Sequence, residues 1–379
     1  MKIGIEATSA VASQKAGVGY YTYHLIRSLV QLRSAPHLFT LYFRHPISNV
    51  SRLFDIADDA AASLLLRVLR FPYFWAQMRL PFEFWRYPQD VYFFPASIIP
   101  LSYVPEKSVM TIHDIAFLFF PDCFSPSLRR WLTLATERGV QTAHKIIAVS
   151  EATRQDLIAY YGLAPERVVA IHHGVHEMFH PLDDHRITPI HQKYHIRRPY
   201  LLCVGTLQRR KNIPRLIQAF YLLKQKYHLP HTLVLIGQKY TDLPEDEIFV
   251  TIERLFLDEE VLWTGYVPAQ DLPALMSGAE IFVLPSLYEG FGMPLLEAMA
   301  CGVPVACSNI SSLPEVIGKC GVMFDPYCVE SIVDTLYQLV GDQHLRTELR
   351  AKGLLRAASF SWNTCARKTL DVLESVGQE

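Results

Sequence analysis

The sequence predicts an α/β protein of two doubly wound domains, each built on a parallel sheet. Short apolar runs recur along the chain, and several of them end in a glycine-containing turn. Such runs are typical of parallel strands that are buried on both faces. The length of 379 residues is long for one domain and suits two, and the apolar half of the composition is enough for a large core.

The composition excludes several classes of protein. A net charge of −1 argues against general nucleic-acid binding. The seven cysteines contain no CxxC pair, which favours reduced thiols over a disulfide framework. The chain enters a strand at once, without a charged and apolar leader, and no apolar run is long enough to span a membrane. We therefore expect a cytoplasmic protein.

In the first half of the chain, apolar runs predict strands at residues 2–6, 38–43, 90–94, 108–112, 145–149 and 167–171. Gly17 and Gly19 follow the first strand and open an amphipathic helix. A strand, glycines and a helix start form a turn that suits an anion. The turn is not a dinucleotide fingerprint, because Thr22 stands where the third glycine is needed. A tight turn that packs the helix on the strand is an equal alternative.

Two strand ends of this half carry polar residues. His113 and Asp114 follow the strand at 108–112, at the edge where open α/β sheets place their ligands. Asp114 is expected to fix the tautomer of His113, although a structural histidine is the alternative. Ser150 is expected to cap the helix that begins at Glu151.

Residues 179–199 lack a clear period and predict a linker, after which a second sheet starts. Its strands are expected at 200–204, 232–236, 261–264, 281–284, 303–306 and 321–324. Gly205, Arg210 and Lys211 follow the first of them and form another turn that suits a phosphate. A solvated run of cations is the alternative. Ser311 and Ser312 are expected to cap a short helix.

The stretch 285–302 predicts strand, loop and helix, with Pro294 at the first helical position and Gly302 at the helix end. The first N–H groups of this helix suit a phosphate. Glu289 in the loop and Glu297 one turn into the helix are expected to face one crevice, where carboxylates suit sugar hydroxyls. The alternative is an ordinary turn with two solvated glutamates.

The run from Glu289 to Val305 carries every fixed position of the signature E-G-F-G-x-P-x-x-E-A-M-A-x-G-x-P-V. In this the chain resembles the family 4 (group 1) retaining glycosyltransferases, and most of all the bacterial mannosyltransferases of surface-polysaccharide biosynthesis. The resemblance implies the GT-B fold, with two Rossmann-like doubly wound domains that face each other across a cleft. It implies an acceptor-binding domain at 1–182, a nucleotide-sugar-binding domain at 183–358, and a helix at 359–379 that packs back on the first domain.

The resemblance also implies roles for single residues. The catalytic residues would be His113, Glu289, Arg210 and Lys211. Asp114 would support His113, and Thr206 replaces an arginine that many members have. The residues that bind the donor would be Gly17, Gly19, Gly205, Gly265, Tyr266, Val267, Gly290, Phe291, Gly292, Met293, Pro294, Leu295 and Glu297.

The expected reaction is transfer of a hexose, with mannose from GDP-mannose as the first candidate, to a glycan or lipid-linked acceptor with retention of configuration. No metal and no cofactor are expected. An NAD-dependent oxidoreductase is an alternative, but this sequence lacks the glycine fingerprint that such enzymes use to bind the dinucleotide. A catalytically silent subunit that binds nucleotide sugar is another.

Residues 61–87 differ from the rest of the chain, because many aromatic residues accompany four arginines and a single acid, Glu83. Such a stretch can lie on an anionic membrane surface, and peripheral membrane contact is one interpretation. The other is a buried pair of helices whose arginines reach water.

Overall fold

The computed structural model describes residues 1–11, 17–32, 37–47, 50–57, 61, 63–71, 75–97, 99–239 and 246–379. The chain divides into two compact units. The first combines Met1–Phe119, Pro126–Gly174 and Ser361–Glu379, and the second combines Phe120–Ser125 and Val175–Phe360. The chain therefore crosses between the units at each of these junctions.

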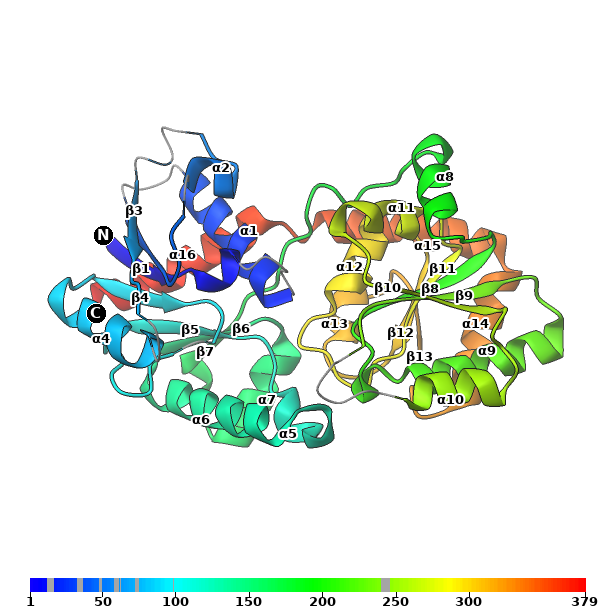
Figure 1. The fold of residues 1–379 in the computed structure, drawn as a ribbon, viewed down its shortest axis with the longest axis horizontal. Coiled ribbons are helices and arrows are strands. Elements are labelled where there is room, and N and C mark those ends of the chain that lie inside the picture. Colours follow the sequence, from blue (N-terminus) through cyan, green and yellow to red (C-terminus); the bar gives the residue numbers. More distant parts are fainter. Residues whose placement is uncertain are drawn as a thin grey trace. The chain divides into compact units, whose positions relative to one another are not determined.

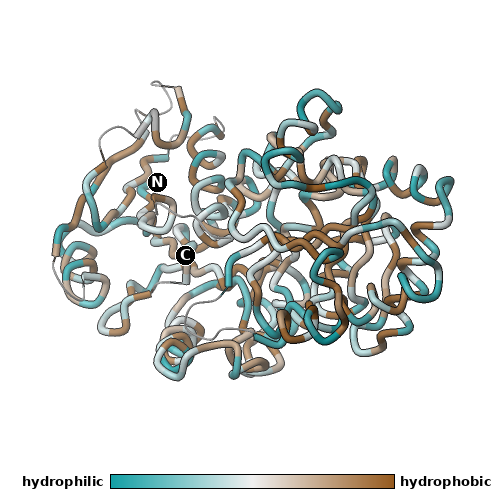
Figure 2. Tube along the Cα trace, turned by 45° about the vertical axis from the view of Figure 1, so that its right-hand side comes forward, coloured by the Kyte–Doolittle hydropathy of each residue, from teal (hydrophilic) through white to brown (hydrophobic). Residues whose placement is uncertain are grey.

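The first unit is built on a seven-stranded parallel sheet with the order β3-β2-β1-β4-β5-β6-β7. Its centre is buried because the strands carry apolar side chains on both faces. In Figure 2, hydrophobic segments run through the interior, and many hydrophilic segments lie toward the outside. The strands are β1 (Lys2–Glu6), β2 (Leu38–Phe43), β3 (Leu64–Val68), β4 (Val91–Phe94), β5 (Ser108–Ile112), β6 (Lys145–Ala148) and β7 (Val168–Ala170).

Helices cover this sheet, and α1 and α16 pack against each other although they lie at opposite ends of the sequence (Figure 1). α16 also packs against β4, β5 and β6. The described helices are α1 (Gly17–Gln31), α2 (Val50–Phe54), α4 (Trp75–Arg86), α5 (Ala116–Phe119), α6 (Pro126–Thr142), α7 (Glu151–Tyr161) and α16 (Trp362–Gln378), with short 3-10 turns η1 (Thr8–Val11) and η3 (Pro165–Arg167).

The second unit has a six-stranded parallel sheet with the order β10-β9-β8-β11-β12-β13. Register pairs such as Phe282 with Leu202 join β11 directly to β8, although these strands lie far apart in the sequence. The strands are β8 (Tyr200–Val204), β9 (Thr232–Ile236), β10 (Val261–Gly265), β11 (Ile281–Leu284), β12 (Val305–Ser308) and β13 (Val322–Phe324).

Two groups of helices cover the two faces of this sheet (Figure 1). One group is α9 (Ile213–Tyr227), α10 (Glu247–Arg254) and α14 (Val329–Gly341). The other is α8 (Asp184–Lys193), α11 (Leu272–Ser277), α12 (Met293–Ala300) and α15 (Gln343–Ala358). Short elements join them: η2 (Pro121–Cys123), η4 (Arg209–Lys211), η5 (Ala269–Asp271) and α13 (Leu313–Ile317). Each unit is doubly wound, as the sequence predicts.

Two predicted segments are corrected by the structure. Residues 179–199 are not a plain linker, because they contain helix α8, whose Ile187 is buried. Residues 61–87 are not a pair of helices. Part of the stretch forms the edge strand β3, which pairs with β2, and another part forms α4. Residues 62 and 72–74 of this stretch lie outside the described residues.

The unit boundaries differ in position from those expected at residues 182 and 358. The stretch after Gly174 is tied to the second unit by two hydrogen bonds. The N–H of Val175 donates to the carbonyl of Phe360 at 3.1 Å, and the N–H of Leu182 donates to Ser277 Oγ at 3.2 Å.

Candidate functional site

The strands β8 and β11 lie side by side, but the chain leaves their carboxyl ends in different directions. β8 continues through Gly205 to η4 and α9, whereas β11 continues through Pro285 to α12. This is a topological switch point, where the loops of an open α/β sheet diverge and leave room for a ligand. The two sequence motifs that suit a phosphate therefore meet at one place.

Lys211 and Glu289 form a buried ion pair at this switch point. Lys211 Nζ lies 2.5 Å from Glu289 Oε1, and the hydroxyl of Ser286 donates to the same oxygen at 2.7 Å. Only 8% of Lys211 and 7% of Glu289 are exposed. The two expected catalytic residues are thus in contact, which sequence spacing alone does not show.

The charges of this pair depend on burial and on each other. Burial raises the pKa of the Glu289 carboxyl, but Lys211 and Arg210 together lower it by more, so the pKa lies below its usual value. Burial lowers the pKa of Lys211 by more than Glu289 raises it, and Arg210 adds to the lowering. A cation next to a carboxylate favours the charged form of that carboxylate, so we treat Glu289 as ionised.

Arg210 joins the same cluster from the other side. Its Nη1 donates to the carbonyl of Tyr288 at 2.9 Å and lies 3.5 Å from Glu289 Oε2. Its Nε donates to Gln208 Oε1 at 3.1 Å. In contrast, the neighbouring Arg209 is exposed. Oε1 of Glu289 is therefore occupied by two short contacts, whereas Oε2 has a single long one.

The backbone of Glu289 is fixed by two serines that were expected to cap helix α13. The hydroxyls of Ser311 and Ser312 instead donate to the carbonyl of Glu289 at 2.7 and 2.9 Å, and the Glu289 N–H reaches Ser311 Oγ at 3.1 Å. α13 has no side-chain cap of its own. Sequence analysis missed this role and that of Ser286. Small polar residues on both sides of a charged loop were the only available signal.

Helix α12 begins directly after this loop. Gly292 has φ +99°, and an added Cβ would meet Leu313 Cδ2 at 2.7 Å, so only glycine suits the position. Pro294 lies in the first turn, and Leu295 N–H bonds back to the carbonyl of Gly292 at 3.0 Å. Gly290 and Phe291 are buried, and Met293 is half-buried. The helix start is therefore in the place expected of a phosphate seat.

Glu297 lies in the second turn of α12 and differs from Glu289 in having no partner. It is half-buried and makes no hydrogen bond or ion pair with any described residue. Burial raises the pKa of its carboxyl to about 7. A carboxyl of this kind is a candidate for hydrogen bonds with a ligand.

The turns after β8, β9 and β10 are joined through glycine backbones. Gly205 N–H donates to Ile236 O at 2.9 Å, and Gly237 N–H donates to Gly265 O at 3.0 Å. After Gly265, the ring of Tyr266 is 53% exposed, whereas Val267 is buried. This places an accessible aromatic ring at the carboxyl edge of the sheet.

In the first unit, His113 follows β5 and is half-buried. Its Nε2 bonds to the carbonyl of Pro95 at 2.8 Å, so the backbone fixes the tautomer with the proton on Nε2. The expected role of Asp114 is corrected, because its Oδ1 accepts the N–H of Ala116 and caps α5. Burial lowers the pKa of His113 by more than Pro95 and Asp114 raise it. Gly17 and Gly19 begin α1 as expected.

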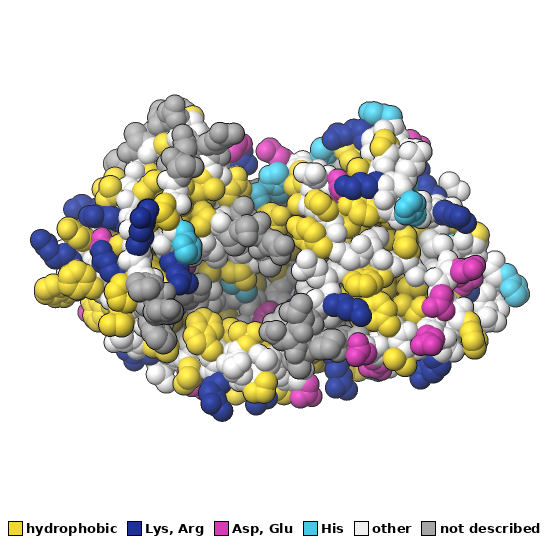
Figure 3. Space-filling model, in the orientation of Figure 1, with side chains coloured by type: hydrophobic (Ala, Val, Ile, Leu, Met, Phe, Trp, Pro, Cys, Tyr) yellow, Lys and Arg dark blue, Asp and Glu magenta, His cyan; other side chains and the backbone are white. Residues whose placement is uncertain are grey.

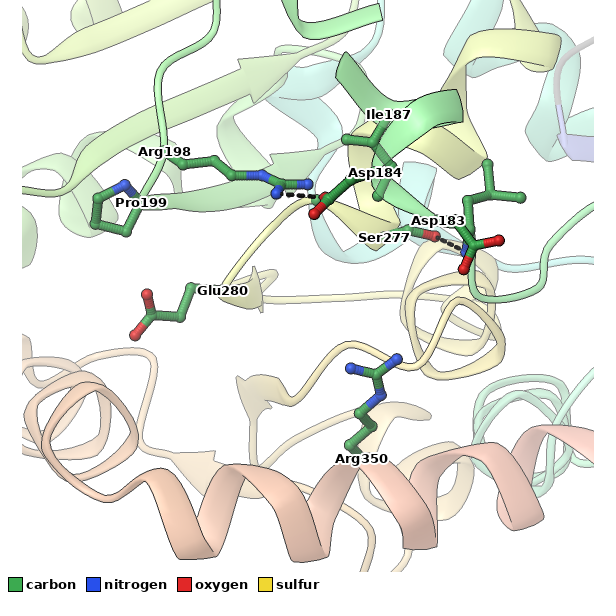
Figure 4. Close-up of a pocket in the computed structure, with 10 residues that line it drawn as sticks. Asp183, Asp184, Ile187, Arg198, Pro199, Ser277, Glu280 and Arg350 are labelled. Atoms are coloured by element: carbon green, nitrogen blue, oxygen red, sulfur yellow. Dashed lines mark hydrogen bonds and ion pairs between the residues drawn. The ribbon is translucent and has the colours of Figure 1, made fainter.

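A separate cavity of about 450 Å³ lies at the opposite end of the second sheet (Figure 4). It is lined by Pro199 and Glu280, which precede β8 and β11, and by charged side chains including Arg198 and Arg350. Arg198 and Asp184 pair at 2.7 Å in this cavity. None of the expected site residues lines it.

Among the described residues, no three His, Cys, Asp or Glu side chains are grouped as metal ligands. Within the same residues, no helix combines the length and the apolar character needed to cross a bilayer.

Two family models and one full-length relative match the chain. The model of glycosyl transferases group 1 matches residues 187–356, and that of glycosyltransferase family 4 matches residues 16–178. An O-antigen chain mannosyltransferase B of Escherichia coli is 32% identical over 381 residues, which is 98% of this chain and 99% of that relative. The chain is a family 4 (group 1) glycosyltransferase. The resemblance seen in the signature is confirmed.

Other relatives of this glycosyltransferase are partial matches. A serotype-specific mannosyltransferase of Escherichia coli, WbdA, is 34% identical over 280 residues, which is 72% of this chain but 34% of the relative. The chain thus spans about a third of that protein's length.

Solved structures confirm the fold of this glycosyltransferase. A sucrose-phosphate synthase of Thermosynechococcus elongatus aligns with a TM-score of 0.75, 16% identity and 99% coverage of both chains. HepE of Anabaena in complex with UDP-glucose aligns with a TM-score of 0.74 and 18% identity, over 99% of this chain and 100% of that one. At these identities the likeness shows the fold alone: two Rossmann-like domains of the GT-B class.

The buried ion pair predicts a coupled effect on stability. Lys211→Met should lower the unfolding free energy of this glycosyltransferase by about 3 kcal/mol, because it leaves the Glu289 carboxylate buried without its closest cation. Adding Glu289→Gln should recover much of that loss, since the uncompensated charge is removed. Urea unfolding followed by fluorescence measures both, with exposed Lys226→Met as the control, which should show no comparable loss. Additive losses in the double variant would contradict the coupling.

The raised pKa of Glu297 predicts a pH-dependent stability. The unfolded chain loses this proton near pH 4.5 and the folded chain near pH 7, so the side chain destabilises the fold as pH rises between these values. Glu297→Gln should therefore stabilise the protein by up to about 3 kcal/mol at pH 8, and by less than about 1 kcal/mol at pH 5. Denaturant unfolding at both pH values tests this, with the exposed Glu253→Gln variant as the control. An equal gain at both pH values would refute the assignment.

Proposed function

We propose that this glycosyltransferase moves a hexose from a nucleotide sugar to a glycan or lipid-linked acceptor with retention of configuration, and that the donor is GDP-mannose. The observation that carries the proposal is the buried cluster of Lys211, Arg210 and Glu289 at the switch point of the second sheet. Two cations on rigid elements suit a diphosphate, and one ionised carboxylate among them suits sugar hydroxyls.

The main chemical requirement of the transfer is to stabilise the departing diphosphate. The bond between the anomeric carbon and the diphosphate oxygen breaks, a bond to the acceptor oxygen forms, and the acceptor proton passes to the departing diphosphate. Negative charge grows on the diphosphate in the transition state. Arg210, Lys211 and the N–H groups at the start of α12 supply fixed positive charge for it. Such groups need little reorganisation because the protein already holds them in place.

The two glutamates bind hydroxyl groups of different parts of the donor. Oε2 of Glu289 has a single contact, at 3.5 Å, and accepts hydroxyls of the transferred sugar. Glu297 has no partner among the described residues and accepts the ribose hydroxyls, which favour its ionised form. The exposed ring of Tyr266 stacks on the base. His113 accepts a hydroxyl of the sugar through Nδ1, because Nε2 is bonded to Pro95.

Support for mannose comes from relatives of this chain. The full-length relative and WbdA are named mannosyltransferases, and the name of the first also includes the O-antigen chain. HepE was solved with UDP-glucose, so the fold alone does not select GDP-mannose as the donor. The donor therefore has to be tested against other nucleotide sugars. A catalytically silent subunit is the second candidate, and turnover distinguishes it.

Transfer assays test the proposed function. GDP-mannose should be consumed and should raise the melting temperature more than UDP- or ADP-sugars do. Arg210→Ala should lower kcat/KM about 100-fold, because it removes a fixed charge from the leaving group. Exposed Arg209→Ala, one residue away, should stay within about fivefold. No protection by any nucleoside diphosphate, together with unchanged transfer in Arg210→Ala, would contradict the proposal.

We also propose that the outward face of α4 binds an anionic membrane surface. Met78, Phe82 and Trp85 recur at helical spacing and are 60%, 54% and 71% exposed, whereas Leu80 and Phe84 are buried. Apolar residues that line the outside of a helix in this way are unusual in a soluble unit. Figure 3 shows hydrophobic side chains beside Lys and Arg side chains over this part of the first unit.

The charges around this face support an anionic partner. Glu83 is buried and lies 2.8 Å from Arg79 and 3.5 Å from Arg67, so the acid does not oppose the surface cations. Arg70 and Arg86 are exposed, and Arg86 lies over the ring of Tyr87 at 5.0 Å. Exposed aromatic rings with flanking arginines suit the interface of an acidic bilayer.

Vesicle co-sedimentation tests this surface. Arg70→Glu with Arg86→Glu should lower binding to vesicles of phosphatidylglycerol and phosphatidylcholine more than about tenfold, because each arginine near such a surface contributes about 1 kcal/mol. Arg67 and Arg79 are left intact, since they neutralise Glu83. The control, exposed Arg129→Glu with Arg130→Glu on α6, removes equal charge from the same unit. An equal loss in the control, or no loss in either pair, would reject α4 as the membrane face.

A further inference from the structure

We infer that Tyr21, His173 and Trp362 are positioning residues for His113: their packed rings hold the imidazole in the orientation it uses on the sugar. The inference rests on the proposed function, in which His113 contacts the transferred hexose. All four residues belong to the first unit. They come from α1, the segment after β7, the start of α16 and the end of β5, so no stretch of sequence shows them together.

One edge of His113 is fixed by the backbone. A carbonyl oxygen only accepts hydrogen bonds, so the 2.8 Å contact between Nε2 and Pro95 places the ring proton on Nε2. The other nitrogen, Nδ1, then carries a lone pair and makes no hydrogen bond with any described residue. One bond leaves the ring able to rock about its Nε2 edge. A further contact is needed to fix its plane.

Tyr21 supplies that contact. Its ring meets His113 edge-on, with centroids 4.8 Å apart and an interplanar angle of 86°. Its hydroxyl lies 3.1 Å from Thr111 Oγ1 on β5, two residues before His113. Tyr21 is 1% exposed. The phenol therefore connects α1 to the strand that carries His113, and it packs on the imidazole at the same time.

The rings of His173 and Trp362 pack against Tyr21 and support its position. His173 lies 4.8 Å from Tyr21 and 5.9 Å from His113, and Trp362 stacks on His173 at 5.8 Å and 21°. Trp362 also stacks on His24 at 5.2 Å. Its indole N–H is buried and has no hydrogen-bond partner among the described residues, so ring contacts alone hold this side chain. Since the N–H makes no hydrogen bond, Trp362 contributes to the cluster through the packing of its ring face.

The backbone fixes Trp362 against the chain that carries His173. A Cβ on Gly174 would meet the backbone N of Trp362 at 2.1 Å, so no side chain fits there. Burial, His113 and His172 hold the pKa of His173 well below its usual value, so its ring stays neutral and packs as an aromatic group. The whole cluster is therefore a neutral, rigid backing for His113.

The test compares substitutions that remove an aromatic ring with a substitution that keeps the ring. Tyr21→Leu and Trp362→Leu should each lower kcat at least about tenfold, because a misplaced catalytic group is costly. Affinity for GDP should stay unchanged, since the proposed nucleotide contacts lie in the second unit. Tyr21→Phe should keep at least half of the activity. Trp131→Leu, a 42% exposed tryptophan on α6, is the matched control and should behave as wild type.

Nitrogen-15 NMR of labelled histidine gives a readout that a merely structural role would not move. His113, assigned by loss of its signal in His113→Gln, should show a single Nε2–H tautomer in the wild type and in Tyr21→Phe. In Tyr21→Leu and Trp362→Leu its signals should shift toward a mixture of tautomers. An unchanged His113 spectrum in both leucine variants, or equal loss of activity in Tyr21→Phe and Tyr21→Leu, would overturn the inference.

The same experiments separate this inference from the proposed function. If His113→Gln leaves transfer intact, the proposed role of His113 fails whatever its neighbours do. If His113→Gln abolishes transfer while Tyr21→Leu and Trp362→Leu change neither kcat nor the spectrum, the positioning role alone fails. Thermal melts of each variant show that the fold is retained.

Discussion

A charge buried in a protein is stable only when an opposite charge and hydrogen bonds surround it, and Lys211 and Glu289 meet that constraint at the junction of β8 and β11. Ser286 donates to the same carboxylate oxygen as Lys211, and Arg210 lies 3.5 Å from the other oxygen. The ion pair thereby holds two loops, which lie about eighty residues apart in the chain, at a fixed distance from each other. The loop before α12 and the cations of η4 keep their mutual geometry because this pair joins them.

Three residues expected at the site, Glu289, Glu297 and His113, differ in their electrostatic state because burial and neighbouring groups act on each of them differently. Glu289 is ionised because cations outweigh the effect of burial. Glu297 lacks a partner, and burial alone raises the pKa of its carboxyl to about 7. His113 is kept neutral with its proton on Nε2. All three can accept hydrogen bonds from hydroxyl groups, such as those of a sugar or a ribose. A ligand that donates to Glu297 would favour the ionised form of its carboxyl.

The two units contribute rigidity in different ways. In the second unit, hydrogen bonds between charged groups and backbone atoms hold the loops. In the first, aromatic rings from distant segments hold a histidine, and α16 supplies Trp362 from the far end of the chain. The first unit also presents apolar side chains outward on α4, with Glu83 neutralised beneath them. One face of α4 thus packs into the first unit, and the other exposes apolar side chains.

The sequence by itself determined the alternation of strands and helices, because burial on both faces leaves continuous apolar runs. The bounds of β1, β2, β5, β8, β9 and β11 agree with prediction, and the other predicted strands differ by one or two residues at one or both ends. It also determined the signature around Glu289, whose spacing is local. Tertiary structure alone decided that β3 is a strand, that Pro95 rather than Asp114 orients His113, and that Ser311 and Ser312 hold Glu289. These outcomes depend on which distant groups lie within hydrogen-bond or packing distance, and local periodicity carries no information about such partners.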